Sequence, residues 1–110
     1  MQNFIDNEFY LISGATSAPT SITTGIMGTR FYNNSTYHYY GTNTGSATVS
    51  GDIFLQGRVT DDSPFITFFS TNIKSATGNY INYSNITWNS VRGIVIPTGG
   101  NITIAARIQS

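Results

Sequence analysis

An alternation of apolar and polar residues with a period of two runs through the middle of the chain and constrains its fold more than any other feature. From Ala47 to Val59, one set of alternate positions is apolar or glycine, and the set between them is largely polar. Successive side chains of a β-strand point to opposite faces of its sheet, so this pattern predicts an antiparallel strand that is buried on one face. Gly51 and Gly57 belong to the apolar set and indicate bulges, bends or the close approach of another backbone.

The composition favours strands and turns over helices. Ser, Thr, Asn and Gly make 50 of the 110 residues, whereas the good helix formers Ala, Leu, Glu, Lys, Met and Gln are scarce. The chain also has 14 Ile, seven Tyr and seven Phe residues. β-Branched and aromatic residues suit a pleated surface, while Asn, Gly and Ser suit turns. We therefore expect an all-β domain, since a disordered chain would lack this many Ile and aromatic residues.

The C-terminal region carries the second strong pattern. Two apolar segments, Val91–Ile96 and Ile102–Ile108, flank the turn-forming residues Pro97–Asn101. The pattern predicts a hairpin in which Gly99 or Gly100 takes a positive φ, with the last strand central in the fold. The expected core consists of the inward-facing residues of the predicted strands together with the single Trp: Ile53, Leu55, Val59, Trp88, Val91, Val95, Ile102 and Ile104.

Turn residues divide the rest of the chain into short extended pieces. This spacing predicts an antiparallel β-sandwich of about seven to nine short strands, either a jelly roll or an immunoglobulin-like sandwich. Residues 1–24 are the least regular part and are expected to form an extended N-terminal arm or edge segment, with the sandwich domain over residues 25–110. A first strand followed by a long loop is the alternative for residues 1–24.

Charge and cysteine content exclude several classes of function. The formal net charge is zero, and five scattered Lys and Arg residues argue against a nucleic acid partner. The chain has no cysteine, which excludes disulfides, thiolate metal sites and thiol catalysis. No stretch approaches the roughly 18 apolar residues of a membrane span, so no membrane association is expected. The N-terminus also lacks the basic and then apolar pattern of a signal segment.

The sequence offers no convincing catalytic or metal-binding group. The only imidazole, His38, has no acidic residue near it in the sequence. Asp61 and Asp62 are adjacent, so their side chains diverge in a turn, and convergence with Asp52 on a calcium ion is not favoured. We expect a protein that is not an enzyme, with no catalytic residues, no metal site and no cofactor.

A cluster of aromatic residues supplies the candidate binding site. The candidate contacts for a partner protein or a glycan are Tyr32, Tyr37, Tyr39, Tyr40 and Trp88. Tyr is favoured at protein interfaces, and its ring can also stack on a sugar, whereas packing between strands of the sheet is the purely structural alternative. On a strand, Tyr37 and Tyr39 share one face, and His38 and Tyr40 share the other.

Two segments of the chain resemble a known class of proteins. Ser46–Arg58, followed by the Trp-Asn-Ser-Val-Arg sequence and the Gly-Gly turn within Trp88–Ile104, is similar to small β-sandwich domains in virion proteins of tailed bacteriophages. The resemblance covers about residues 46–108. Related domains commonly have a Ser-x-Asp-Gly loop and a Trp after the first of these strands, whereas this chain has Thr60–Phe65 there.

The resemblance implies a structural role in a virion. A small chain that starts at Met1 and ends soon after its last predicted strand is expected to be a complete capsid decoration (cement) protein on the capsid surface. Its expected partners are the major capsid protein or other virion proteins, and it is expected to be a homo-oligomer, plausibly a trimer. Residues 1–24 are then the expected clamp on a neighbouring subunit. The alternative function is a carbohydrate-binding or host-receptor-binding module of a tail or fibre.

Overall fold

A computed structural model describes residues 6–16, 23–28, 33–86 and 88–109, which contain eight β-strands and no helix. Within these residues there is consequently no helix with the length and hydropathy that crossing a bilayer requires. The strands are β1 (Asp6–Thr16), β2 (Thr23–Gly28), β3 (Asn34–Thr42), β4 (Ser50–Arg58), β5 (Ile66–Ile73), β6 (Asn79–Ser84), β7 (Ser90–Gly99) and β8 (Asn101–Gln109).

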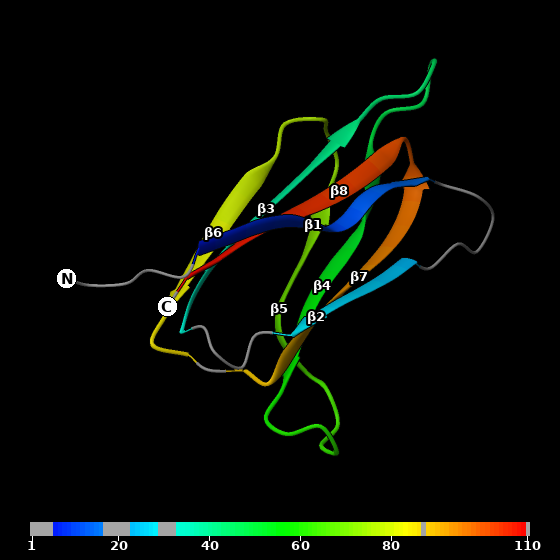
Figure 1. Cartoon of the computed structure of the whole chain (residues 1–110). Coiled ribbons are helices and arrows are strands. Elements are labelled where there is room, and N and C mark those ends of the chain that lie inside the picture. Colours follow the sequence, from blue (N-terminus) through cyan, green and yellow to red (C-terminus); the bar gives the residue numbers. More distant parts are fainter. Residues whose placement is uncertain (1–5, 17–22, 29–32, 87, 110) are drawn as a thin grey trace.

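The strands form two four-stranded sheets that pack face to face (Figure 1). The strand order is β1-β8-β3-β6 in the first sheet and β2-β7-β4-β5 in the second, and every pairing is antiparallel. Most connections pass from one sheet to the other, which is the arrangement of an eight-stranded jelly roll. The predicted antiparallel sandwich is confirmed, and of the two kinds that the sequence left open it is the jelly roll.

The core lies between the two sheets and follows the predicted alternation of β4. The largest fully buried side chains are Tyr37, Val49, Ile53, Leu55, Val91, Val95, Ile102, Ile104 and Ile108. Trp88 is half-buried and packs against this core. The prediction for Val59 is wrong, since its side chain is 65% exposed. β4 ends at Arg58, and the chain then turns through residues 60–63, so the period of two no longer decides which way Val59 points.

The predicted C-terminal hairpin is also wrong. β7 pairs with β2 and β4, whereas β8 pairs with β1 and β3, so the two strands lie in opposite sheets. Gly99 and Gly100 therefore form a corner between the sheets. Turn residues specify that the chain reverses, but they do not specify whether the next strand stays in the same sheet. The central position of β8 and a positive φ at Gly100 (66°) are as predicted.

Part of the N-terminal segment belongs to the sandwich. β1 is an edge strand that pairs along its length with β8, and its Leu11 and Ile12 side chains are buried in the core. Residues 6–16 are thus a strand of the fold and not a free arm. Residues 1–5 and 17–22 of the predicted arm lie outside the described residues.

A β-bulge in β1 changes which side chains reach each face. Tyr10 lies opposite Ala105 and Ile12 lies opposite Ile104, so Leu11 is an extra residue in the pairing with β8. Leu11 and Ile12 both point into the core, whereas Tyr10 is 63% exposed on the outside. Bulges of this kind re-aim a side chain relative to the alternation of the strand.

The corner at Gly100 gives a stability prediction with a matched control. Gly45 (φ 55°) and Gly100 (φ 66°) both have the left-handed backbone that disfavours a Cβ atom by about 1–2 kcal/mol. A Cβ at Gly45 would meet nothing within 4 Å, whereas one at Gly100 would lie 2.6 Å from the carbonyl oxygen of Thr42. We expect Gly100→Ala to lower the free energy of unfolding by about 1 kcal/mol more than Gly45→Ala does in urea denaturation. Equal losses of stability for the two variants would mean that the backbone around Gly100 shifts enough to relieve the contact with Thr42.

Candidate functional site

The outer face of the β1-β8-β3-β6 sheet carries exposed rings from three of its strands, namely Tyr10 of β1, His38 of β3 and Tyr80 of β6. β3 directs Tyr37 into the core and exposes His38 on the opposite face, as the alternation predicted. Tyr40 lies on the same outer face as His38, and their ring centroids are 4.8 Å apart with the planes tilted by 38°.

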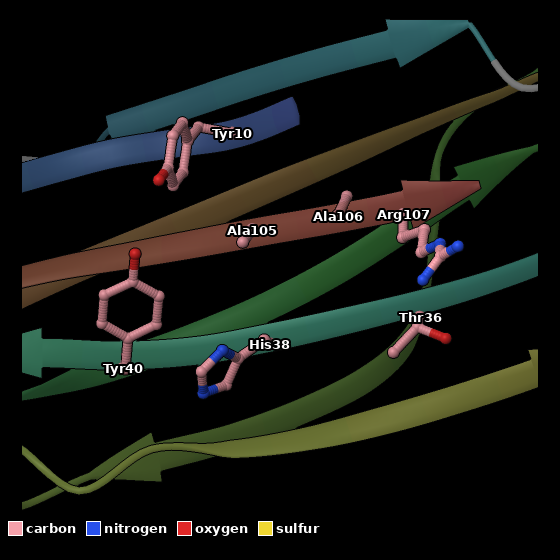
Figure 2. A pocket seen from close by; sticks show the side chains of 7 residues that line it. All are labelled: Tyr10, Thr36, His38, Tyr40, Ala105, Ala106 and Arg107. Atoms are coloured by element: carbon pink, nitrogen blue, oxygen red, sulfur yellow. The ribbon is translucent and has the colours of Figure 1, made fainter. Parts of the chain in front are cut away.

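A hollow of about 510 Å³ lies on this face (Figure 2). Figure 2 shows that it is formed by side chains of three adjacent strands, β1, β8 and β3. The residues that line it are Tyr10, Thr36, His38, Tyr40, Ala105, Ala106 and Arg107.

The register of the strands explains why the sheet surface is hollowed here. Tyr10, Ala105, His38 and Tyr80 are paired in one row across β1, β8, β3 and β6. Ala105 has the smallest side chain of the row, so it leaves a depression in the surface between the rings of Tyr10 and His38. In the neighbouring row, Arg107 lies opposite Thr36 and closes one end of the hollow.

Interactions between neighbouring side chains support the walls of the hollow. The Tyr40 hydroxyl interacts with that of Tyr10, on the far side of β8, and with that of Thr103 on β8. Partial burial, reinforced by the neighbouring Tyr10, raises the pKa of Tyr40 above its usual value. On the β6 side, the Thr36 hydroxyl donates to Oδ1 of Asn82 at 2.6 Å.

The lining of the hollow combines rings with polar groups. It includes the imidazole of His38, the side chain of Arg107 and the hydroxyls of Tyr10, Thr36 and Tyr40, but no carboxylate. Across the described residues, no group of three or more His, Cys, Asp or Glu side chains comes close enough together to hold a metal ion.

The predicted aromatic contacts do not form one surface. Tyr37 is fully buried, and burial raises its pKa to about 12. Tyr39 and Trp88 are half-buried and pack against the core from the inner face. Of the predicted set, Tyr40 alone lines the hollow, and Tyr32 lies outside the described residues.

The buried aromatic side chains instead join the two sheets. Tyr37 of β3 contacts Phe68 of β5, with ring centroids 6.1 Å apart. Phe68 in turn stacks on Trp88 at 5.4 Å and meets the edge of Tyr83 at 5.1 Å. Tyr37 and Trp88 therefore have the structural role that the sequence left as one alternative, namely packing between strands.

Sequence reasoning missed most of the hollow. Tyr10 had no usable signal, because a regular strand would place it on the same face as Ile12, which is buried. Tyr80 is 63% exposed and lies opposite His38, a pairing that only the fold reveals. On β8, Arg107 alternates with the buried residues Ala106 and Ile108, and its side chain is exposed on the outer face.

The outer face of the second sheet carries a different surface. Phe54 of β4 lies opposite Ile94 of β7, and both side chains point outward and are half-buried, as is that of Ile96. At one end of this apolar strip, the guanidinium groups of Arg58 and Arg92 lie over the Phe65 ring, at 4.8 and 4.1 Å from its centroid.

No protein-family model matches the sequence, and no curated protein matches it either. Solved structures do match. The SPBc2 prophage-derived protein YomS superposes with a TM-score of 0.71 at 15% identity, over 100% of this chain and 97% of YomS. This likeness shows that the two proteins share a fold.

Two further structures share the same fold at lower similarity. The exported protein XepA of PBSX matches with a TM-score of 0.64 at 8% identity, over 93% of this chain but only 36% of XepA. The coat protein of tobacco streak virus matches with a TM-score of 0.53 at 7% identity, over 97% of this chain and 85% of the coat protein. A shared fold alone does not establish a shared function.

Proposed function

We propose that this chain is a non-enzymatic structural protein of a phage virion, and more specifically a capsid decoration protein that bridges neighbouring capsid subunits. The observation that carries the proposal is the match to YomS, a prophage-derived protein, over nearly the full length of both chains. The jelly roll of a virus coat protein and the resemblance of residues 46–108 to phage virion domains add support.

The apolar strip on the second sheet is the proposed contact with the shell. Phe54, Ile94 and Ile96 lie outside the core, on the face of a sheet that alternation would otherwise make polar. Burying such a strip against a capsid subunit removes apolar surface from water, at about 25 cal/mol per Å². A protein that binds only the assembled shell stabilises that shell by mass action.

The proposed partners are the major capsid protein or other virion proteins, and the proposed location is the capsid surface. A homo-oligomer, as a trimer on a local threefold axis, is proposed because sites on a shell are symmetric. We do not propose residues 1–24 as a clamp on a neighbouring subunit. Deleting them would remove β1 together with buried Leu11 and Ile12, so the deletion would test folding and not attachment.

The proposal is tested on particles of the phage or prophage that encodes the chain. We expect the protein in purified particles at a fixed ratio to the major capsid protein by quantitative mass spectrometry, and on the shell by electron cryomicroscopy. The variant Ile94→Asp should not add to shells, because it places a carboxylate directly opposite Phe54, whereas the native Asp52 lies opposite Ile96 at the end of the strip. The matched control Val59→Asp should add normally, since Val59 is exposed outside the strip.

Two results would reject the decoration role. The first is absence of the protein from purified particles. The second is its presence only at the tail, in a few copies per particle. Normal occupancy by Ile94→Asp would keep the virion role but exclude the apolar strip as the contact.

The alternative function, a glycan-binding or receptor-binding module, loses most of its predicted contacts. Tyr37 is in the core, and Tyr39 and Trp88 pack against it, so these rings do not form an exposed platform. A different set of residues on the outer face of the first sheet has the required arrangement.

A further inference from the structure

We propose that the hollow on the outer face of the β1-β8-β3-β6 sheet is a saccharide-binding site, in which a sugar ring lies over Ala105 between Tyr10 and His38. The proposal goes beyond the structural role above and is independent of it. It depends on the geometry of the hollow and not on the location of the protein in a virion.

The size of the hollow fits a small ligand. Its volume of about 510 Å³ lies inside the range of roughly 300–1,000 Å³ that is usual for small-molecule sites. Tyr10 and His38 are two strands apart, which places their backbones about 10 Å from each other. The methyl group of Ala105 between them leaves room for one ring to enter edge-on or to lie along the strand (Figure 2).

Exposed rings stand on both sides of the floor of the hollow. Tyr10 is 63% exposed and His38 is exposed as well. Tyr80, also 63% exposed, does not line the hollow but lies beside His38 in the same row of the sheet. Single exposed apolar residues are ordinary, but rings gathered in one row around a hollow indicate a binding surface. The faces of aromatic rings carry partial negative charge, which attracts the weakly positive C–H groups on the face of a sugar.

Polar groups at the ends of the hollow match the hydroxyls of a sugar. At one end, Thr36 presents a hydroxyl that is oriented by its bond to Asn82, and the side chain of Arg107 lines the hollow beside it. At the other end, the paired hydroxyls of Tyr10 and Tyr40 offer further acceptors. A purely apolar ligand would displace water from the hydroxyls of Thr36, Tyr10 and Tyr40 without replacing its hydrogen bonds, which makes it a poorer fit.

The site is organised before a ligand arrives. Tyr40 packs against the His38 ring, with centroids 4.8 Å apart, and its hydroxyl interacts with that of Tyr10, so the three rings support one another. Binding then costs less side-chain entropy, which matters for a weakly binding ligand such as a sugar. A protein partner fits less well, since a standard interface needs about 800 Å² on each side, whereas the special feature here is one small hollow.

The test uses the folded full chain on a microarray of bacterial-surface and animal glycans, followed by NMR titration with the glycan that gives the strongest signal. We expect Tyr10→Ala to weaken that binding about tenfold or more, because it removes one wall. Ala105→Leu should weaken it similarly by filling the floor. The control Val59→Ala, at an equally exposed apolar residue outside the hollow, should bind like the parent.

Tyr10→Ala keeps the test valid if Ala105→Leu fails to fold, because the Tyr10 side chain lies outside the core. Thermal melting of each variant identifies such a failure. The proposal is overturned if the parent binds no glycan on the array and shows no shifts of Tyr10 or His38 signals at millimolar sugar. It is also overturned if glycan binding survives Tyr10→Ala unchanged, or if that substitution weakens the binding of a partner protein and not the binding of a glycan. None of these outcomes decides whether the protein decorates capsids.

Discussion

Replacing Ile104 with alanine is expected to lower the free energy of unfolding by about 2–5 kcal/mol. Ile104 is fully buried on the central strand β8, where it pairs with Ile12 of β1 and Tyr39 of β3. Its Cδ1 atom reaches toward Gly93 of β7 in the opposite sheet. Truncation therefore opens a cavity at the centre of the core, where close packing on every side limits collapse. The expected loss is a large share of the roughly 5–15 kcal/mol that stabilises a typical domain.

The matched control is the same substitution at an exposed position. Ile66 on β5 is 57% exposed, so Ile66→Ala should change the free energy of unfolding by no more than about 0.5 kcal/mol. Arg107→Ala should likewise be tolerated by the fold, because that side chain is on the outer face. Urea denaturation followed by circular dichroism measures all three. If Ile104→Ala melts like the parent while Arg107→Ala unfolds the protein, the faces of β8 are assigned the wrong way round.

The second large effect is expected for Gly57→Val. A Cβ atom at Gly57 would lie 2.3 Å from Cδ2 of Trp88, and two more atoms of that ring would be 2.6 Å away. The ring cannot retreat easily, since Phe68 stacks against it with the planes only 20° apart. Overpacking of this kind costs about 1–3 kcal/mol and sometimes more, and we expect Gly57→Val at the upper end of that range.

A double variant separates this clash from other effects of the substitution. Trp88→Ala alone should destabilise the protein by removing a packed ring. If the clash is the cause, Gly57→Val combined with Trp88→Ala should be much more stable than the sum of the two single losses predicts. Additive losses would mean that Gly57 is required for a reason other than the approach of Trp88.

The sequence was informative wherever one face of a strand is buried and the other is solvated. The alternation from Val49 to Gly57 corresponds to the inward face of β4, and the apolar face of β8 is buried from Ile102 to Ile108. Local periodicity reports which side chains share a face. It carries no information on which sheet a strand joins, which is why the connection of β7 to β8 was taken for a hairpin.

The candidate site was largely beyond prediction for a related reason. Its lining residues come from three strands that are distant in the sequence, and the register between β1, β8 and β3 brings them together. The bulge at Leu11 then reverses the side on which Tyr10 would be expected relative to Ile12. Conversely, the sequence cluster around Tyr37 is a cluster only along the chain, because neighbouring residues of a strand point in opposite directions.

The position of β8 between β1 and β3 has a consequence for how the protein is made. β8 is synthesised after the other seven strands of the sandwich, yet it is the strand with which both β1 and β3 pair. Until then, β1 and one edge of β3 expose unpaired backbone groups, which invite pairing with other chains. Fold formation that waits for such distant contacts is slow. Chains broken off before Asn101 should consequently aggregate or be degraded, so that intact copies alone are available for assembly.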